Sequence, residues 1–447
     1  MTTWEVIMWV ALGVLSLGLV SQWWWQPRLP VWLQRPRGGP WLWYLVGYPS
    51  TVLRVLVTWR KVCQISDLSV VRRPRYAMVG KDSMVRAVAL RPLPPRLGLP
   101  LVTSTGLAVR VHLHPGQTPG QFIACADAFA HAWRMHSVRV ISDKRGQVLI
   151  MATARNPLED MEDLPARQLP PARVLSTVVG RVGDASPWEI DFRKVPHWLV
   201  AGATQSGKST LLAALVTQLG HQRVALVGID CKGGLELGLF SRRLSALATS
   251  RPEAVDVLTA LVTELENRMR VCRSAGVRSI WEIHGSARPV PVVVIVDEIA
   301  ELYLAGSSLA GRKEAVECST LLLRLAQLGA ALGMHLVVAA QRFGSELGPG
   351  ATALRAQLGG RICHRVHDEA TAEMTLGDLS PDAVDVALAI GEDEQGVAVT
   401  TVGGHWQRAR SWLITPDEAA RHAARNAHHT PHLDALAQGT EQGGDTT

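Results

Sequence analysis

A glycine-rich stretch between an apolar run and a helix-forming run is the part of this sequence best suited to chemistry. Gly202 and the triplet Gly207, Lys208 and Ser209 have the spacing G-x-x-x-x-G-K-[ST]. In such a loop successive backbone N–H groups surround phosphates, because glycine lets the main chain approach without a Cβ, and the following helix adds its positive N-terminal end. We predict that Lys208 reaches the β and γ phosphates and that the Ser209 hydroxyl ligates Mg²⁺.

The flanking segments favour this interpretation over a chance glycine-rich turn. Residues 198–201 form an apolar run of strand length, and residues 211–219 form a helix-like run that ends at Gly220. A strand, a turn and a helix in this order are the context that the motif requires. The sequence therefore predicts ATP and Mg²⁺ as ligands, and no other small-molecule substrate. The predicted nucleotide-binding residues are Gly202, Ala203, Thr204, Gln205, Ser206, Gly207, Lys208, Ser209 and Thr210.

Two carboxylates follow a second apolar run at residues 291–296. They are Asp297 and Glu298, at the carboxyl end of a predicted buried strand, where open α/β sheets place their sites. We expect Asp297 to hold Mg²⁺ through water or the Ser209 hydroxyl, and Glu298 to polarise the attacking water. An apolar run ending in Asp-Glu is a weak signal alone, and the preceding phosphate-binding loop strengthens it.

Polar side chains near two further apolar runs are candidates for the same site. Gln341 follows one such run and would sense the γ-phosphate and orient water, although a polar cap at the strand end is the alternative. Arg355 and Arg361 are candidates for an arginine that completes a neighbouring subunit's site by neutralising charge in the transition state. An ordinary ion pair is the alternative for either arginine.

The elements that must position these residues alternate along the chain. Apolar runs predict strands at residues 198–201, 223–230, 292–296, 335–340 and 361–366, with helices between them. Such alternation predicts an α/β fold with a parallel sheet covered on both faces.

Length and composition limit the possibilities further. A chain of 447 residues is long enough for two or three domains, and its six cysteines include no C-x-x-C pair, which argues against a disulfide framework or a zinc site. The net charge is +7. Residues 1–75 hold nine basic and two acidic residues, and the remainder is balanced at 37 against 37. Any contact with nucleic acid must therefore come from local placement of arginines.

The N-terminal 75 residues predict a membrane anchor. Residues 4–25 are a largely apolar stretch with one charge, Glu5, and carry tryptophans at both ends, as a transmembrane helix does. Residues 40–59 are a second apolar stretch, interrupted by Pro49 and Arg54. The positive-inside tendency slightly favours one span plus an interfacial helix, and two spans remain the alternative. In either arrangement the site faces cytoplasmic ATP, which predicts a cell-membrane protein with a cytoplasmic ATPase.

Composition divides the rest of the chain into three parts. Residues 76–170 read as a small α/β module with a strand at 106–114, a helix at 118–136 and strands at 138–141 and 148–152, followed by a proline-rich acidic linker. Residues 171–416 contain the alternating strands and helices. Residues 417–447 are a polar tail, after a helix start near Pro416.

Six segments resemble, in this order, the FtsK/SpoIIIE family of hexameric DNA-pumping ATPases. They are PHWLVAGATQSGKST, GIDCKGGLEL, ENRMRVCRSAGVRSIWEIHG, VVVIVDEIAEL, RLAQLGAALGMHLVVAAQR and LRAQLGGRICHRV, and the resemblance covers residues 100–416. It implies a RecA-like P-loop NTPase motor preceded by a small α/β module, a homohexameric ring, and double-stranded DNA as partner. It places residues 202–210, Asp297, Glu298 and Gln341 on the family's nucleotide positions, and Arg361 on the arginine of an R-I pair, our choice for the trans-acting arginine.

Two departures from the family pattern bear on function. The loop after Arg342 is longer than the family's Gln-Arg-Pro continuation, and nothing after Ile414 is long enough for a winged-helix DNA reader. The arrangement most resembles the transfer ATPases of conjugative plasmids and integrative elements in mycelial Gram-positive bacteria. This implies a membrane-anchored, ATP-driven translocase of double-stranded DNA in conjugative transfer or segregation. A protein-secretion ATPase of the EccC type and a non-hydrolysing membrane scaffold are the alternatives.

Overall fold

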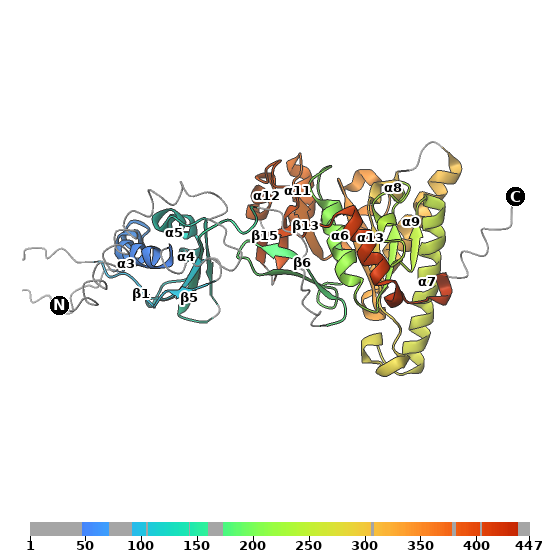
Figure 1. Ribbon diagram of the computed structural model, residues 1–447, viewed down its shortest axis with the longest axis horizontal. Coiled ribbons are helices and arrows are strands. Elements are labelled where there is room, and N and C mark those ends of the chain that lie inside the picture. The colour runs from blue at the N-terminus through green and yellow to red at the C-terminus, as the bar shows by residue number, and fades with distance from the viewer. Residues whose placement is uncertain are drawn as a thin grey trace, which may run out of the picture. The chain divides into compact units, whose positions relative to one another are not determined.

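The computed structural model describes residues 47–70, 92–103, 106–142, 144–159, 173–304, 308–377, 381–402 and 405–436 (Figure 1). The chain divides into an N-terminal unit, Met1–Pro157, and a C-terminal unit, Leu158–Thr447. The transmembrane helix predicted at residues 4–25 lies outside the described residues. Within the described ranges, no helix combines the length and the apolar character needed to cross a membrane.

The N-terminal unit is an antiparallel sheet with helices against one face. Its strands pair in the order β1-β3-β5-β4, and β2 also pairs with β3. The elements are α3 (Tyr48–Ile65), β1 (Arg96–Leu97), β2 (Leu101–Val102), β3 (Gly106–His112), α4 (Pro119–Ile123), α5 (Ala126–Trp133), β4 (Ser137–Ile141) and β5 (Gln147–Thr153).

Helix α3 contributes one face to this unit's core. Val55, Trp59 and Cys63 are buried at four-residue spacing among apolar side chains of β3, β5 and α5. The Trp59 ring stacks on Phe129 at 5.8 Å, and its indole N–H donates to the Pro95 carbonyl at 2.9 Å. The described part of the second predicted apolar stretch, residues 47–59, thus packs on the α/β module.

The helix predicted over residues 118–136 is two helices, so this prediction was wrong in detail. The chain turns at Ala124 and Cys125 between α4 and α5. The turn lets Phe122 on α4 and both Phe129 and Trp133 on α5 face the same core, where all three are fully buried. Local sequence does not report this, because either arrangement satisfies helix propensity.

The C-terminal unit is built on a ten-stranded sheet within the described residues, in the order β10-β9-β11-β12-β8-β13-β14-β15-β6-β7. Its strands are β6 (Ser176–Val182), β7 (Pro187–Asp191), β8 (His197–Ala201), β9 (Ala225–Ile229), β10 (Ala246–Ala248), β11 (Val292–Val296), β12 (Met334–Ala340), β13 (Gly360–His364), β14 (Val397–Val402) and β15 (His405–Ser411). The five predicted strands are present as β8, β9, β11, β12 and β13.

The prediction of a parallel sheet is correct for only part of this sheet. Strands β10, β9, β11, β12, β8 and β13 are parallel, but β14, β15, β6 and β7 extend the sheet antiparallel from β13. Antiparallel neighbours need only hairpin connections, so β6–β7 and β14–β15 join without crossover helices. The alternation rule therefore did not detect them.

Helices cover both faces of the parallel strands, as predicted (Figure 1). The helices described in this unit are α6 (Lys208–Leu219), α7 (Arg251–Ser274), α8 (Ile299–Tyr303), α9 (Leu309–Leu328), α10 (Ala351–Gln357), α11 (Glu369–Leu376), α12 (Pro381–Leu388), which packs on β14, and α13 (Pro416–Arg425), with short 3₁₀ turns η3 (Leu237–Phe240), η4 (Ile280–Glu282), η5 (Gly285–Ala287), η6 (Ala330–Leu332), η7 (Ser345–Leu347) and η8 (Ala427–His429).

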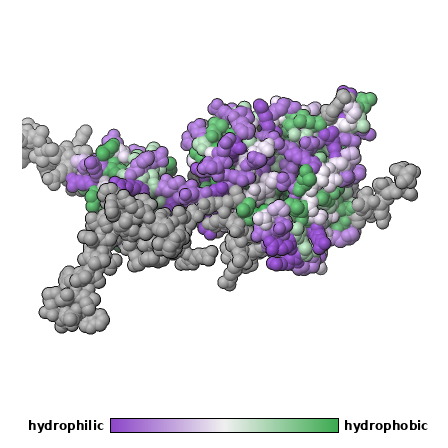
Figure 2. Space-filling model, turned by 45° about the horizontal axis from the view of Figure 1, so that its top comes forward, coloured by the Kyte–Doolittle hydropathy of each residue, from purple (hydrophilic) through white to green (hydrophobic). Residues whose placement is uncertain are grey.

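Strand β11 illustrates this double burial. Val292, Val294 and Val296 face the core formed with α7, α8, α9 and α10, whereas Val293 and Ile295 face the core formed with α6 and α13. Every residue of β11 is therefore buried, which accounts for its continuous apolar sequence. On the molecular face drawn in Figure 2, the hydrophobic residues of the C-terminal unit appear in small separate groups among hydrophilic ones.

We predict that Trp59→Ala destabilises the N-terminal unit by about 3–5 kcal/mol, because it removes a buried ring together with its hydrogen bond to Pro95. Leu56→Ala on the same helix is the control, since Leu56 is 55% exposed and its loss is expected within about 0.5 kcal/mol. Hydrogen exchange of the β3 amides in the full chain measures both. Equal protection in the two variants would contradict the assignment of α3 to this core.

Candidate functional site

The predicted phosphate-binding loop joins two elements at the carboxyl edge of the sheet. Strand β8 ends at Ala201 and helix α6 begins at Lys208, with Gly207 at its N-cap. Main-chain bonds hold the loop to both neighbouring strands. The Gly202 N–H donates to the Ala340 carbonyl of β12 at 3.1 Å, and the Ala203 N–H donates to the Arg365 carbonyl after β13 at 2.8 Å.

Close approaches explain why two positions in this loop are glycine. Gly207 has φ +111°, and a Cβ there would lie 2.4 Å from the main chain of Gly396. A Cβ on Gly202 would lie 2.6 Å from the Ser206 hydroxyl and 2.7 Å from the His364 side chain. The loop is thus packed closely enough on its supporting strands that its backbone has a defined shape.

Lys208 lies in the loop with its ammonium among carbonyl groups. Its Nζ donates to the carbonyls of Gly202 and Ala203, the latter at 3.1 Å. Burial lowers the pKa of Lys208, and the Glu298 and Asp297 carboxylates oppose that shift. A triphosphate would give this half-buried cation an anionic partner that offsets the cost of its burial.

Asp297 and Glu298 lie at the end of β11, two strands away from β8. Both are nearly buried, and the ammonium of Lys232 lies 3.7 Å from Asp297 and 3.6 Å from Glu298. Burial raises the pKa of Asp297 to about 6, while Lys232 acts in the opposite direction. One oxygen of Glu298, Oε2, is buried without a hydrogen-bond partner, which suits a group that must accept a proton from water.

Lys232 was not among the predicted site residues. The side chain of Asp230, fully buried after β9, accepts hydrogen bonds from the N–H groups of Lys232, Glu236 and Leu237. This loop brings Lys232 to the two carboxylates of the neighbouring strand β11. The available signal was the Asp-Cys-Lys sequence at the carboxyl end of a predicted strand, residues 223–230, at the same sheet edge as Asp297.

Gln341 lies between the two halves of the site. It follows β12, which pairs with β8 on one side and β11 on the other. Its N–H donates to Glu298 Oε1 at 3.3 Å, and its side chain is exposed. Its strand therefore places Gln341 between the phosphate-binding loop and the carboxylates.

The structure does not bring Arg361 to this group. Arg361 pairs with Leu199 near the start of β13, whereas the phosphate-binding loop follows the other end of the neighbouring strand β8. Its guanidinium donates to the Arg355 carbonyl at 3.0 Å, and Arg361 is 8% exposed. Arg355 is half-buried and donates to the Phe343 carbonyl at 3.0 Å. Either arginine would have to change partners to serve a neighbouring subunit, so the trans-acting role stays a prediction.

The residues present fit ATP and Mg²⁺. The loop leaves no room for a Cβ at Gly202 and Gly207, and the half-buried ammonium of Lys208 lies in it. The Ser209 hydroxyl and the Asp297 carboxylate are oxygen ligands of the kind that Mg²⁺ prefers. Within the described ranges there is no cluster of three or more His, Cys, Asp or Glu suited to a metal. Two protein ligands suffice here, because Mg²⁺ at such sites completes its coordination with water and phosphate.

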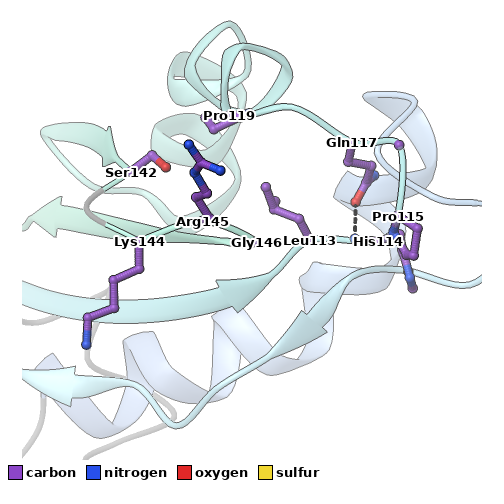
Figure 3. A pocket seen from close by; sticks show the side chains of 10 residues that line it. Leu113, His114, Pro115, Gln117, Pro119, Ser142, Lys144, Arg145 and Gly146 are labelled. Carbon is purple, nitrogen blue, oxygen red and sulfur yellow. Dashed lines mark hydrogen bonds between the residues drawn. The ribbon is translucent and has the colours of Figure 1, made fainter.

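A separate cavity of about 570 Å³ lies in the N-terminal unit between the β4–β5 hairpin and the loop after β3 (Figure 3). Arg145 and Lys144 extend to opposite sides of the hairpin, and the Gln117 side chain accepts from the His114 N–H at 2.9 Å. No predicted site residue lines this cavity, which leaves the site on β8, β11 and β12 as the candidate centre.

Two families match the chain. Residues 165–345 match the FtsK/SpoIIIE family, and residues 31–154 match the N-terminal domain of actinomycete conjugal transfer proteins. The transfer protein TraSA of Streptomyces ambofaciens is 40% identical over 398 residues, which cover 86% of this chain and 94% of that protein. The DNA translocase FtsK of Sporosarcina ureae is 28% identical over 317 residues, 60% of this chain and 39% of that longer protein.

Among solved structures, the fold is similar to the pCW3 conjugation coupling protein TcpA in its monomer form with ATPgS. The TM-score is 0.53 at 20% identity, covering 82% of this chain and 98% of TcpA. At this identity the likeness concerns the fold. It extends over both units, in agreement with the two family matches.

We predict that Gly207→Ala abolishes ATP binding, because a Cβ would both strain the left-handed backbone and displace Gly396. Gly116→Ala in the N-terminal unit is the control. Gly116 has φ +92° and open space where a Cβ would lie, so Gly116→Ala introduces backbone strain of about 1–3 kcal/mol but no steric clash. Titration with a fluorescent ATP analogue separates the two. Unchanged affinity in Gly207→Ala would show that the loop does not bind ATP in this form.

The raised pKa of Asp297 predicts that Mg²⁺ affinity falls at acidic pH. Below a pH of about 6 the carboxyl holds a proton that Mg²⁺ must displace, so apparent Mg²⁺ affinity in ATP turnover should fall about tenfold per pH unit. Lys232→Gln removes the cation that opposes this shift, so in this variant the loss of Mg²⁺ affinity should begin at a higher pH. Lys194→Gln, which removes an exposed lysine paired with Asp191, is the control. A pH-independent Mg²⁺ affinity from pH 5 to 7 would refute this assignment.

Proposed function

Because the chain belongs to the FtsK/SpoIIIE family and carries, before the family domain, the N-terminal domain of actinomycete conjugal transfer proteins, we propose that it is an ATPase that moves double-stranded DNA during conjugative transfer or segregation. The observation that carries this proposal is the convergence of the phosphate-binding loop, Asp297 with Glu298, and Gln341 at the edge of three adjacent strands.

The proposed division of labour follows from these positions. Lys208 and the N–H groups of the loop that follow Ala203 bind the phosphates, and Ser209 and Asp297 hold Mg²⁺. When bound, Mg²⁺ neutralises charge on the phosphates as it develops. Glu298 accepts the proton of the attacking water at Oε2, which has no hydrogen-bond partner and lies 3.6 Å from the Lys232 ammonium, and Gln341 orients that water. Lys232 holds both carboxylates in place before nucleotide arrives.

The assembly is proposed as a homohexameric ring anchored to the cell membrane, with the ATPase on the cytoplasmic side. In a ring, each subunit can supply an arginine to the nucleotide site of its neighbour, and Arg361 is the candidate for that arginine. The anchor is proposed from the apolar residues 4–25 and the basic residues that follow them.

Charge is divided unequally between the two units. The N-terminal unit holds 19 Lys and Arg against 5 Asp and Glu, a net +14, whereas the C-terminal unit holds 27 against 34, a net −7. Excess basicity therefore extends through residues 76–157 and is not confined to the first 75. A polyanion approaching the chain is attracted to the N-terminal unit, and that attraction weakens with salt.

We expect ATP turnover by the full chain in detergent or nanodiscs to rise when duplex DNA is added and to depend on Lys208. Lys208→Ala should abolish turnover because the phosphates lose the half-buried cation of the loop. Glu298→Gln should keep ATP affinity but lower kcat by about 10²-fold or more, because it removes the proton acceptor. Steady-state hydrolysis with and without DNA measures both.

The control is Glu301→Gln, since Glu301 lies one helical turn away on the same helix segment and is not assigned to the chemistry. If turnover persists in Lys208→Ala, the site assignment fails. If a helical secreted protein stimulates turnover and DNA does not, the protein-secretion alternative replaces DNA translocation.

A further inference from the structure

A hairpin outside the predicted nucleotide site supports the phosphate-binding loop. The residues that lead into β14 are Gln395 and Gly396, and the Gly396 N–H donates to the Ser206 carbonyl at 3.0 Å. The main chain of Gly396 also occupies the space where a Cβ on Gly207 would lie, at 2.4 Å. A shift of these two residues would therefore change the shape of the loop or the support beneath it.

Arg410 near the end of β15 fixes this support. It is 7% exposed, and its Nε donates to the Gln395 carbonyl at 2.9 Å. The following residue, Ser411, donates its N–H to the Gly396 carbonyl at 3.3 Å. The end of β15 thus holds both residues that lie against the phosphate-binding loop.

The same guanidinium binds the segment that joins the two units. Arg410 Nη1 donates to the Leu158 carbonyl at 2.7 Å and to the Glu159 carbonyl at 2.8 Å. The Leu158 side chain is 3% exposed and packs in a cluster that includes Cys363 and Val397. Leu158 is the first residue of the C-terminal unit, directly after Pro157. One side chain therefore connects the segment leaving the N-terminal unit with the backbone that supports the loop.

We propose that Arg410 is a positioning residue that couples docking of the Leu158–Glu159 segment to ATP binding. With the segment docked, the guanidinium is held by carbonyls on both sides and keeps Gln395 and Gly396 against the loop. With the segment released, Arg410 loses two of its acceptors and the support loosens. Coupling of this kind is reciprocal, so ATP binding would in turn favour the docked segment. This inference rests on the proposed function as an ATPase.

The test compares full-length variants by KM for ATP and kcat. In Arg410→Gln we expect KM to rise about fivefold or more while kcat stays within about twofold, because the loop is loosened and the chemical groups remain. Arg410→Lys keeps the charge but cannot bridge both sides, so KM should rise less. Arg408→Gln is the matched control, since Arg408 lies on the same strand but pairs with Glu394 at 2.6 Å.

A double-mutant cycle with Leu158→Ala distinguishes coupling from local damage. We expect Leu158→Ala to raise KM, and the double variant to be no worse than Arg410→Gln, because both changes release the same segment. Additive effects, a KM unchanged in Arg410→Gln, or an equal rise in Arg408→Gln would overturn the proposal. Thermal unfolding checks folding, and Arg410→Lys carries the test if Arg410→Gln does not fold.

Lys208→Ala in the same assay separates this proposal from the proposed function. If turnover does not depend on Lys208, the ATPase assignment fails. If turnover depends on Lys208 but KM is insensitive to Arg410, only the coupling fails.

Discussion

The contact between Gly207 and Gly396 constrains the shape of the phosphate-binding loop on which the site depends. Gly207 and Gly396 are nearly two hundred residues apart in the sequence. Their main chains nevertheless approach so closely that there is no space for a side chain on Gly207. The loop that would bind phosphates is consequently shaped by β8 and α6 and also by the antiparallel strands beyond β13. Those strands form no part of the motif, yet they limit where its backbone N–H groups can point.

Burial and charge make the site ready for an anionic ligand with a divalent cation. Lys208, Lys232, Asp297 and Glu298 bring two ammonium groups and two carboxylates to one edge of the sheet. Burial lowers the pKa of Lys208 and raises the pKa of Asp297, so burial disfavours the charged form of each side chain. Phosphates would pair with the lysine and Mg²⁺ with the aspartate, so binding of the proposed ligands would stabilise this edge of the sheet.

The N-terminal unit contributes charge and a distinct core. Its helix α3 buries Trp59 against Phe129 and Trp133 and leaves Leu53, Leu56 and Val57 exposed on the opposite side. The N-terminal unit is strongly basic and attracts polyanions, whereas the C-terminal ATPase unit is acidic. The two are joined in one chain through a segment that is hydrogen-bonded to Arg410. The family match over residues 31–154 covers this unit as a domain of its own.

The sequence by itself determined the features that depend on neighbouring residues. The spacing of Gly202, Gly207 and Lys208 and the continuous apolar run before Asp297 are local, so the loop, its flanking strand and helix, and the strand ending in two carboxylates could all be predicted. Only the tertiary structure decided which distant segments meet. The four antiparallel strands, the approach of Lys232 to Asp297 and of Gly396 to Gly207, and the burial of Arg361 away from the loop depend on strand order. Strand order is set by packing of whole elements, and no short stretch of sequence encodes it.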